Sequence, residues 1–211
     1  ECVFRDFDND GWIDLLVSGG NQYVMAYNNG DNTFDFVSDN IDYPLNSFAV
    51  GDLNTDGFVD VYGVAGGYGA WGADDIADGI MMNDGNDNHY LMVDLEGVES
   101  NLDGIGAKIV IETAAGTQVR EIRSGESYGI MNSMIAHFGL GSETEVESIT
   151  VYWPSGIIDD IANVDADQTV DIQEGSDAVN VAQTTSVVTA VYPNPTNDNV
   201  TVMIDKSLRS G

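Results

Sequence analysis

FRDFDNDGWIDLLVSGG, residues Phe4 to Gly20, places four aspartates within nine residues and then continues as an apolar run. Carboxylates this close repel one another, and solvent screening removes only part of the repulsion. A bound cation would neutralise them. The spacing of Asp6, Asp8 and Asp10 fits this interpretation, because oxygen ligands at alternate positions converge on one point when the chain curls.

The acidic stretch occurs a second time, as VGDLNTDGFVDVYGVAGG at residues Val50 to Gly67, with its loop 46 residues further on. A second pair of segments, AYNNGDNTF (26–34) and MMNDGNDNHY (81–90), recurs with an offset of 55. The extra length lies in a Gly-rich insertion, residues 68–78. A repeat of this size is typical of stacked units such as propeller blades, each burying its face on a neighbour.

Both loops offer the donor set that calcium prefers. After the three alternate ligands, a glycine at position 6 permits a sharp turn, position 7 offers its carbonyl and position 9 is an aspartate. Mg²⁺ would want fewer protein ligands, and transition metals would want His or Cys. The predicted Ca²⁺ ligands are Asp6, Asp8, Asp10, Trp12 (carbonyl) and Asp14 in the first loop, and Asp52, Asn54, Asp56, Phe58 (carbonyl) and Asp60 in the second.

The alternative is that Asx-rich turns simply close two hairpins, with their acids in solvent. Two copies that match at five positions favour the calcium interpretation. The loops are not EF-hands, because position 12 holds Val17 in one copy and Gly63 in the other, where that motif needs glutamate. Their β-branched and apolar flanks predict that each loop leads into a strand.

The pattern D-x-D-x-D-G-x-x-D followed by an apolar strand resembles the FG-GAP (or VCBS) repeat of integrin-type β-propellers. The segment YNNGDNTF resembles a part found later in such blades. The resemblance covers residues 1–88 and implies calcium-binding blades at the end of a propeller. Two motifs are too few to close one, so further blades are expected upstream of Glu1.

Composition sets the class of protein. The 211 residues carry a formal net charge of −30, 43 % apolar residues and a single cysteine. So acidic a chain is not expected to bind nucleic acid or an anionic membrane, both of which need a basic face. An intrachain disulfide is impossible, so metal ions become a more plausible source of rigidity. No apolar run approaches the length of a membrane span.

Residues 89–175 alternate apolar and polar positions in short runs separated by turn signals, which predicts a β-sandwich or small barrel. The segments SNLDGIGAKI, REIRSGESYGIMNS, HFGLG and ITVYWPSG, followed by NVDADQTVDIQEG, resemble the ASPIC/UnbV domain of cartilage acidic protein-like proteins. That family often has Arg where this chain has Leu102. The resemblance implies an extracellular setting, and it gives no catalytic residues to carry over because the family's activity is poorly defined. The fold class is therefore all-β: partial propeller blades plus a sandwich-like domain.

No catalytic constellation emerges from the residues. His137 beside Phe and Gly is expected to be a packed side chain, and Ser155 in WPSG to lie in a turn. His89 and His137 could form an acid–base pair with an acid, but nothing in their spacing supports it. Tyr68 and Trp71 in the Gly-rich insertion could stack on a sugar or peptide.

The tail divides into a Ser/Thr/Ala/Val linker (176–190) and VYPNPTNDNVTVMI, whose last residues alternate as a strand. Residues 191–211 resemble the start of the C-terminal sorting domain of type IX secretion cargo in Bacteroidetes, cut short. The expected protein is therefore secreted or attached to the cell surface. Its expected role is a calcium-stabilised binding or adhesion module with glycan or protein ligands. The alternatives are part of an extracellular, polysaccharide-active enzyme and a structural component of an extracellular assembly.

Overall fold

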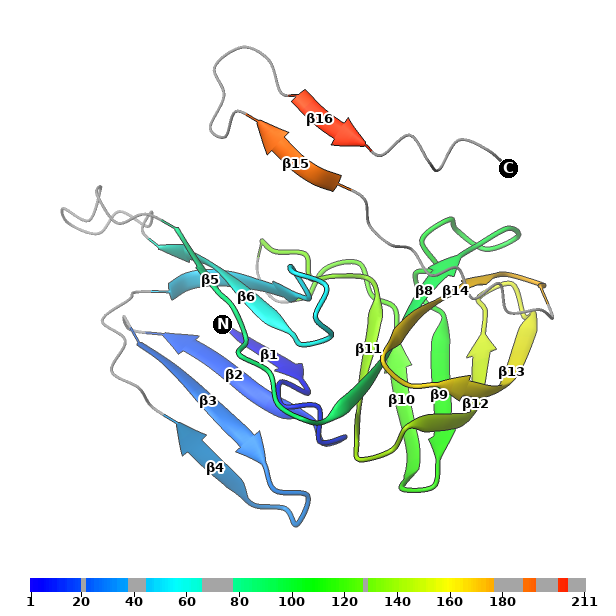
Figure 1. Ribbon diagram of the computed structural model, residues 1–211, viewed down its shortest axis with the longest axis horizontal. Helices are drawn as coiled ribbons and strands as arrows, with labels where there is room; N and C mark the ends of the chain where they lie inside the picture. Colours follow the sequence, from blue (N-terminus) through cyan, green and yellow to red (C-terminus); the bar gives the residue numbers. More distant parts are fainter. Residues whose placement is uncertain are drawn as a thin grey trace. The chain divides into compact units, whose positions relative to one another are not determined.

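The computed structural model describes residues 1–19, 22–37, 45–65, 78–126, 129–176, 188–192 and 201–204. Within these ranges the regular elements are all β-strands, as predicted (Figure 1). The chain forms two compact units, Glu1–Val181 and Ala182–Gly211. Most of the predicted linker, and the aromatic pair Tyr68 and Trp71, lie outside the described residues.

The first sheet is a four-stranded antiparallel meander in chain order (Figure 1). The first acidic loop joins its first two strands, so the predicted loop-to-strand transition is present. Alternation along the strands sends Val3 and Leu16, which face each other in the register, to one buried face. The strands are β1 (Cys2–Arg5), β2 (Asp14–Gly19), β3 (Gln22–Asn28) and β4 (Phe34–Val37).

The second sheet repeats the first, with β5 (Leu45–Gly51), β6 (Asp60–Ala65) and β7 (Gly79–Met81) in antiparallel order. The second acidic loop joins β5 to β6. Side chains of both sheets form one apolar core, so the two repeats stack face to face. Its buried members are Val3, Phe7, Leu16, Phe48, Val50, Val59 and Val61.

The two repeats use opposite faces in this stack. Val50 and Val61 of the second sheet are buried against the first. By the 46-residue offset their counterparts are Phe4 and Leu15, which pair across β1 and β2 on the other face of the first sheet. That face is apolar and open, with Phe4 56 % exposed. The first sheet therefore packs one apolar face on the second sheet and has a second apolar face on its opposite side.

A β-sandwich follows. One sheet has the order β10-β9-β12-β13 and the other β11-β8-β14, in which β8 and β14 run parallel. Residues of both sheets, among them Leu91, Ile109, Phe138 and Ile149, share one fully buried core. The strands are β8 (His89–Glu96), β9 (Lys108–Thr113), β10 (Gly116–Glu121), β11 (Ala136–Gly141), β12 (Glu145–Tyr152), β13 (Ile158–Asp165) and β14 (Gln168–Gln173).

Glu174, just after β14, fastens one end of the sandwich. Its Oε2 accepts the backbone N–H groups of Val98, Glu99 and Ser100, each at 2.7 Å. Its Oε1 accepts the hydroxyls of Ser100 and Ser155. Burial opposes ionisation, yet the hydrogen bonds from Ser155 and Ser100 lower the pKa of Glu174 to about 2. Three of the segments singled out in the sequence, SNLDGIG, WPSG and QEG, thus meet at one carboxylate.

In the second unit β15 (Val188–Tyr192) and β16 (Thr201–Ile204) form an antiparallel pair in which Val191 faces Val202. The strand expected in NVTVMI is therefore present over its last four residues. Among the described residues, no helix is long and apolar enough to cross a membrane.

Candidate metal centre

The first acidic loop is organised by its own carboxylates. Asp6 Oδ2 accepts the N–H of Gly11 at 2.9 Å, which closes the turn at the glycine. Asp14 Oδ2 accepts the N–H of Phe7 at 2.8 Å, and its Oδ1 accepts that of Asn28 at 2.8 Å. Asp14 therefore joins the start of the loop, the start of β2 and the end of β3.

Three of the predicted ligands come together. Asp6, Asp8 and Asp14 each offer a carboxylate oxygen, and these oxygens lie within 4.8 Å of one another. In the described part of the chain this is the one such group of three or more acidic, His or Cys side chains. Asp10 lies outside the group, and its Oδ1 accepts the N–H of Trp12 at 2.8 Å. The side chain of Trp12 packs on another residue, as described below.

Two of the three carboxylates are buried, and Asp8 is partly buried. Asp6 is 1 % exposed and Asp14 is fully buried. Burial raises the pKa of Asp6 to about 7, against the hydrogen bond from Gly11, and the neighbouring aspartates add to the rise. Burial likewise raises the pKa of Asp14 to about 6, against the N–H groups of Asn28 and Phe7. The negative charge of these three carboxylates is unfavourable without a counter-ion. Their hard oxygen donors suit a divalent cation.

The second loop repeats this framework position by position. Asn54 stands where the first loop has Asp8, so the ligand set there is less charged by one. The side-chain oxygens take the same roles in both copies. Asp52 Oδ2 accepts Gly57 N (2.9 Å), Asn54 Oδ1 accepts Asp56 N (3.1 Å), Asp56 Oδ1 accepts Phe58 N (2.9 Å), and Asp60 accepts Leu53 N (2.8 Å) and Asn83 N (2.7 Å).

The structure also assigns a role to the second recurring segment, N-x-G, which sequence reasoning left without one. Asn28 and Asn83 each donate a backbone N–H to the position-9 aspartate. The aromatic ring at position 7 of each loop packs against the glycine two residues after this asparagine. A Cβ on Gly30 would lie 2.6 Å from the Trp12 indole, and one on Gly85 would lie 3.1 Å from the Phe58 ring. The sequence signal that could have linked the two motifs is that each N-x-G segment follows an acidic loop in both copies.

The loops differ in backbone strain and exposure. Position 4 has positive φ in both, +58° at Asn9 and +63° at Thr55. Asn9 is fully buried, whereas the second loop is exposed around Thr55. Asn visits this left-handed region readily, and a β-branched residue does so only under strain.

Replacing Thr55 by asparagine, T55N, is expected to stabilise the protein by about 0.5–1 kcal/mol, because the strain of a β-branched residue at positive φ is relieved. Chemical denaturation with and without T55N measures the change. The matched control N9T should destabilise by at least as much, since Asn9 also donates a hydrogen bond to Gly57. Equal stability of T55N and the parent protein would contradict the strain argument.

The two histidines have different partners. His137 Nε2 donates to the Gly57 carbonyl at 3.0 Å, and burial lowers the pKa of His137 to about 4, so the ring is neutral. His89 Nδ1 lies 2.8 Å from Asp167 Oδ2 on the surface. His137 is a buried contact between the sandwich and the second loop.

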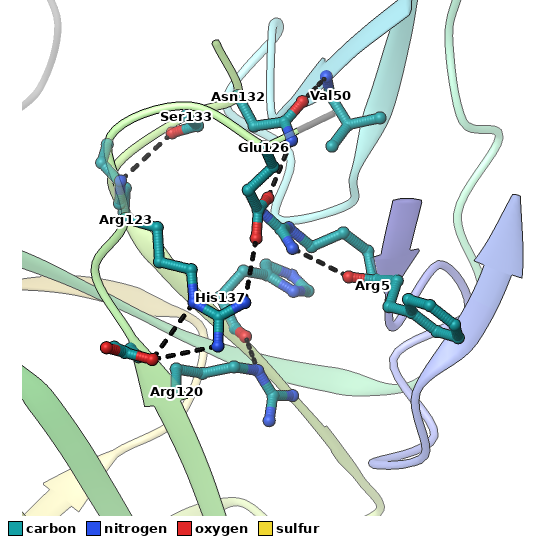
Figure 2. A network of polar contacts seen from close by, with 11 residues as sticks. Arg5, Val50, Arg120, Arg123, Glu126, Asn132, Ser133 and His137 are labelled. Atoms are coloured by element: carbon teal, nitrogen blue, oxygen red, sulfur yellow. Dashed lines mark hydrogen bonds and ion pairs between the residues drawn. The ribbon is translucent and has the colours of Figure 1, made fainter. Parts of the chain in front are cut away.

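A polar network joins the sandwich to both repeats (Figure 2). Arg5 of β1 forms an ion pair with Glu126, at 2.5 Å. Asn132 donates to the same carboxylate at 2.8 Å, and its Oδ1 accepts the N–H of Val50 in β5 at 2.9 Å. Nearby, burial lowers the pKa of Arg120 to about 10 while the charge of Asp6 favours its charged form. The sandwich and the repeats are thus connected by buried and partly buried polar groups.

Comparison with known families agrees with this architecture. Residues 6–63 match the family model described as an FG-GAP-like repeat. Residues 97–179 match the model described as ASPIC and UnbV. The two matched ranges follow one another along the chain. FG-GAP repeats are typical of extracellular or cell-surface proteins. No curated protein matches the chain. The sheets β1–β4 and β5–β7 are hereafter called the FG-GAP-like region, and the sandwich of β8–β14 is called the ASPIC/UnbV region.

Proposed function

We propose that this chain is a calcium-binding module of a secreted or cell-surface protein, in which one Ca²⁺ in each acidic loop holds a blade together and the blades present a binding or adhesion surface. One observation carries the proposal: Asp6, Asp8 and Asp14 converge within 4.8 Å, and the second loop reproduces the same hydrogen-bond framework. Asx turns that merely close hairpins do not require buried carboxylates at positions 1 and 9.

The donor set favours calcium. Each loop supplies carboxylates, carbonyls and, at Asn54, an amide oxygen, and neither loop contains His or Cys. Hard oxygen donors on a flexible loop suit Ca²⁺, which accepts six to eight ligands in irregular geometry. Mg²⁺ demands a tighter octahedron and keeps its water, so the loops should discriminate against it.

A binding role is consistent with the surroundings of Ser155 and His137 and with a cleft in the FG-GAP-like region. The Ser155 hydroxyl donates to the Glu174 carboxylate and not to a histidine, and the His137 ring is buried with its Nε2 donating to the Gly57 carbonyl. A cleft of about 340 Å³ lies between the two sheets of the FG-GAP-like region, and Tyr23, Tyr27 and Met25 are among its lining residues. Aromatic and apolar walls of this kind suit the faces of a glycan or a protein side chain.

The tail is proposed to take part in export. Residues 191–211 would belong to a sorting domain read by type IX secretion machinery of the Bacteroidetes kind. The resemblance of VYPNPTNDNVTVMI supports this, together with the β15–β16 pair.

The test is calcium binding by equilibrium dialysis or calorimetry. Two Ca²⁺ per chain are expected, with a tenfold excess of Mg²⁺ competing weakly. Position 3 gives a matched pair of variants: D8A should remove one ion and N54A the other. Asp35, an exposed residue of β4, provides the control D35A, which should bind both. Absence of bound calcium, or equal binding by all variants, would refute the assignment.

A further inference from the structure

Three successive carbonyls of the first calcium loop are held from outside the loop. Asn83 Nδ2 donates to the Phe7 carbonyl at 2.7 Å. Asn86 and Asn88, on the connection to the sandwich, donate their side-chain N–H groups to the Asp8 carbonyl at 2.6 and 2.8 Å. The Asn9 carbonyl accepts the backbone N–H of Gly141 in β11 at 2.7 Å. The loop backbone is therefore shaped by the second repeat and by the ASPIC/UnbV region together.

Strand β11 lies directly against a proposed ligand. A Cβ on Gly139 would be 2.1 Å from Asp6 Oδ2 and 2.5 Å from the Asn9 Cα, so no side chain fits there. Gln118 of β10 donates to the Gly139 carbonyl at 2.7 Å, which holds this part of β11 in place. The HFGLG segment has its glycines where the calcium loop is closest.

The second loop is supported less. Its Gly57 carbonyl accepts Asn9 Nδ2 and His137 Nε2, both at 3.0 Å, so its position 6 is fixed by the first loop and by β11. The residues between Asp52 and Gly57 are exposed. The Asn54 carbonyl accepts only the local hydroxyl of Thr55 among the hydrogen bonds of the described residues. The two loops thus share a ligand framework, but the second loop is supported at Gly57, where the Tyr90 ring also packs, and not along three successive carbonyls.

We infer that β11 of the ASPIC/UnbV region is a positioning element of the first calcium site, so that calcium binding there and docking of the sandwich stabilise each other. The inference rests on the proposed calcium function and adds a ranking of the two sites by their affinity for calcium. A preorganised loop loses less conformational freedom on binding, so the first site binds Ca²⁺ more tightly than the second. By linkage, whatever affinity the docked sandwich adds to calcium, calcium adds to the docked state.

The experiment compares G139A with G19A by calcium titration. An alanine at 139 displaces Asp6, whereas Gly19 at the end of β2 has no atom within 4 Å of its would-be Cβ. The parent protein should show two phases, and the N54A and D8A variants identify which phase belongs to each loop. G139A should weaken the tighter, first-loop phase by about tenfold or more, as a coupling of ordinary size would. The other phase should change less than twofold, and G19A should match the parent.

Hydrogen exchange gives a second readout, which does not depend on the folding of G139A. The Gly141 amide, bonded to the Asn9 carbonyl, should exchange about tenfold more slowly with saturating calcium. In D8A, calcium should leave this amide unchanged. The inference would be overturned if two ions bind, calcium leaves Gly141 exchange unaltered, and G139A has the same two affinities as the parent protein. The calcium function would then still stand. No bound calcium would instead refute the function itself.

Discussion

Excess chelator is expected to lower the melting temperature of the calcium-saturated protein by about 10–20 °C. Saturation at about 100 times the dissociation constant adds roughly 2.7 kcal/mol per site, so two sites contribute roughly 5 kcal/mol. For a domain of this size each kcal/mol corresponds to about 2–4 °C. That is a large share of the total stability of an ordinary domain.

The chain offers little to compensate for a lost ion. Its formal net charge is −30 and its one cysteine, Cys2, is free. Asp6 and Asp14 lie buried beside other carboxylates, so removal of the cation leaves negative charges that solvent does not reach and that Arg120 offsets only in part. Scanning calorimetry at pH 7.5 with millimolar calcium, then with chelator, measures the loss, and millimolar Mg²⁺ should restore little of it.

The double variant D8A/N54A is the control for this experiment. The position-3 side chains make only local hydrogen bonds: Asp8 accepts one from Asp10 N at 3.3 Å, and Asn54 bonds to Asp56 alone. The double variant should therefore fold, melt near the calcium-free parent and respond little to chelator. A chelator effect of equal size in parent and double variant would place the calcium elsewhere.

The loops and their strands could be predicted from the sequence because their information is local. Alternate oxygen donors, a glycine at position 6 and an apolar run define the turn and the strand that follows. The 46-residue repeat then predicts the second copy, and the structure gives both copies the same hydrogen bonds at Gly11 and Gly57. The all-β class followed from the same alternation.

The support of the first loop could not be predicted. It depends on pairings between residues far apart in the chain, such as Gly141 N to the Asn9 carbonyl. The strand after Asn28-x-Gly30, β4, stays in its own sheet, whereas the strand after Asn83-x-Gly85, β8, pairs with β11 and β14. No local pattern distinguishes these two outcomes, because both segments continue as short extended strands. His137 was correctly expected to be packed, but its acceptor, Gly57, lies 80 residues away.

Calcium affinity at the first loop is expected to fall steeply on acidification between pH 7.5 and 5.5. Burial raises the pKa of Asp6 to about 7 in the calcium-free fold, against 3.8 for an ordinary aspartate. The ionised fraction of a group with a pKa of about 7 falls by roughly 25-fold over this interval, and calcium needs the ionised form. Asp14, whose pKa burial raises to about 6, changes in the same direction.

The sign follows from which state holds the proton. Between about pH 4 and pH 7 the calcium-free fold keeps a proton on Asp6 that the unfolded chain has lost, so this group makes the calcium-free fold less stable as the pH rises. Calcium displaces that proton, so the calcium-bound fold does not lose this stability as the pH rises. The stabilisation by calcium should therefore be largest near pH 7.5 and small near pH 5.

Titration of the N54A variant, which reports the first loop alone, tests this directly. At pH 7, where Asp6 is about half protonated, binding should release about half a proton from this group. Calorimetry in buffers of different ionisation enthalpy measures that number. The Glu174 carboxylate provides an internal contrast, because its hydrogen bonds lower its pKa to about 2 and it stays ionised throughout. Equal first-loop affinity at pH 5.5 and 7.5 would show that the buried Asp6 is not a calcium ligand.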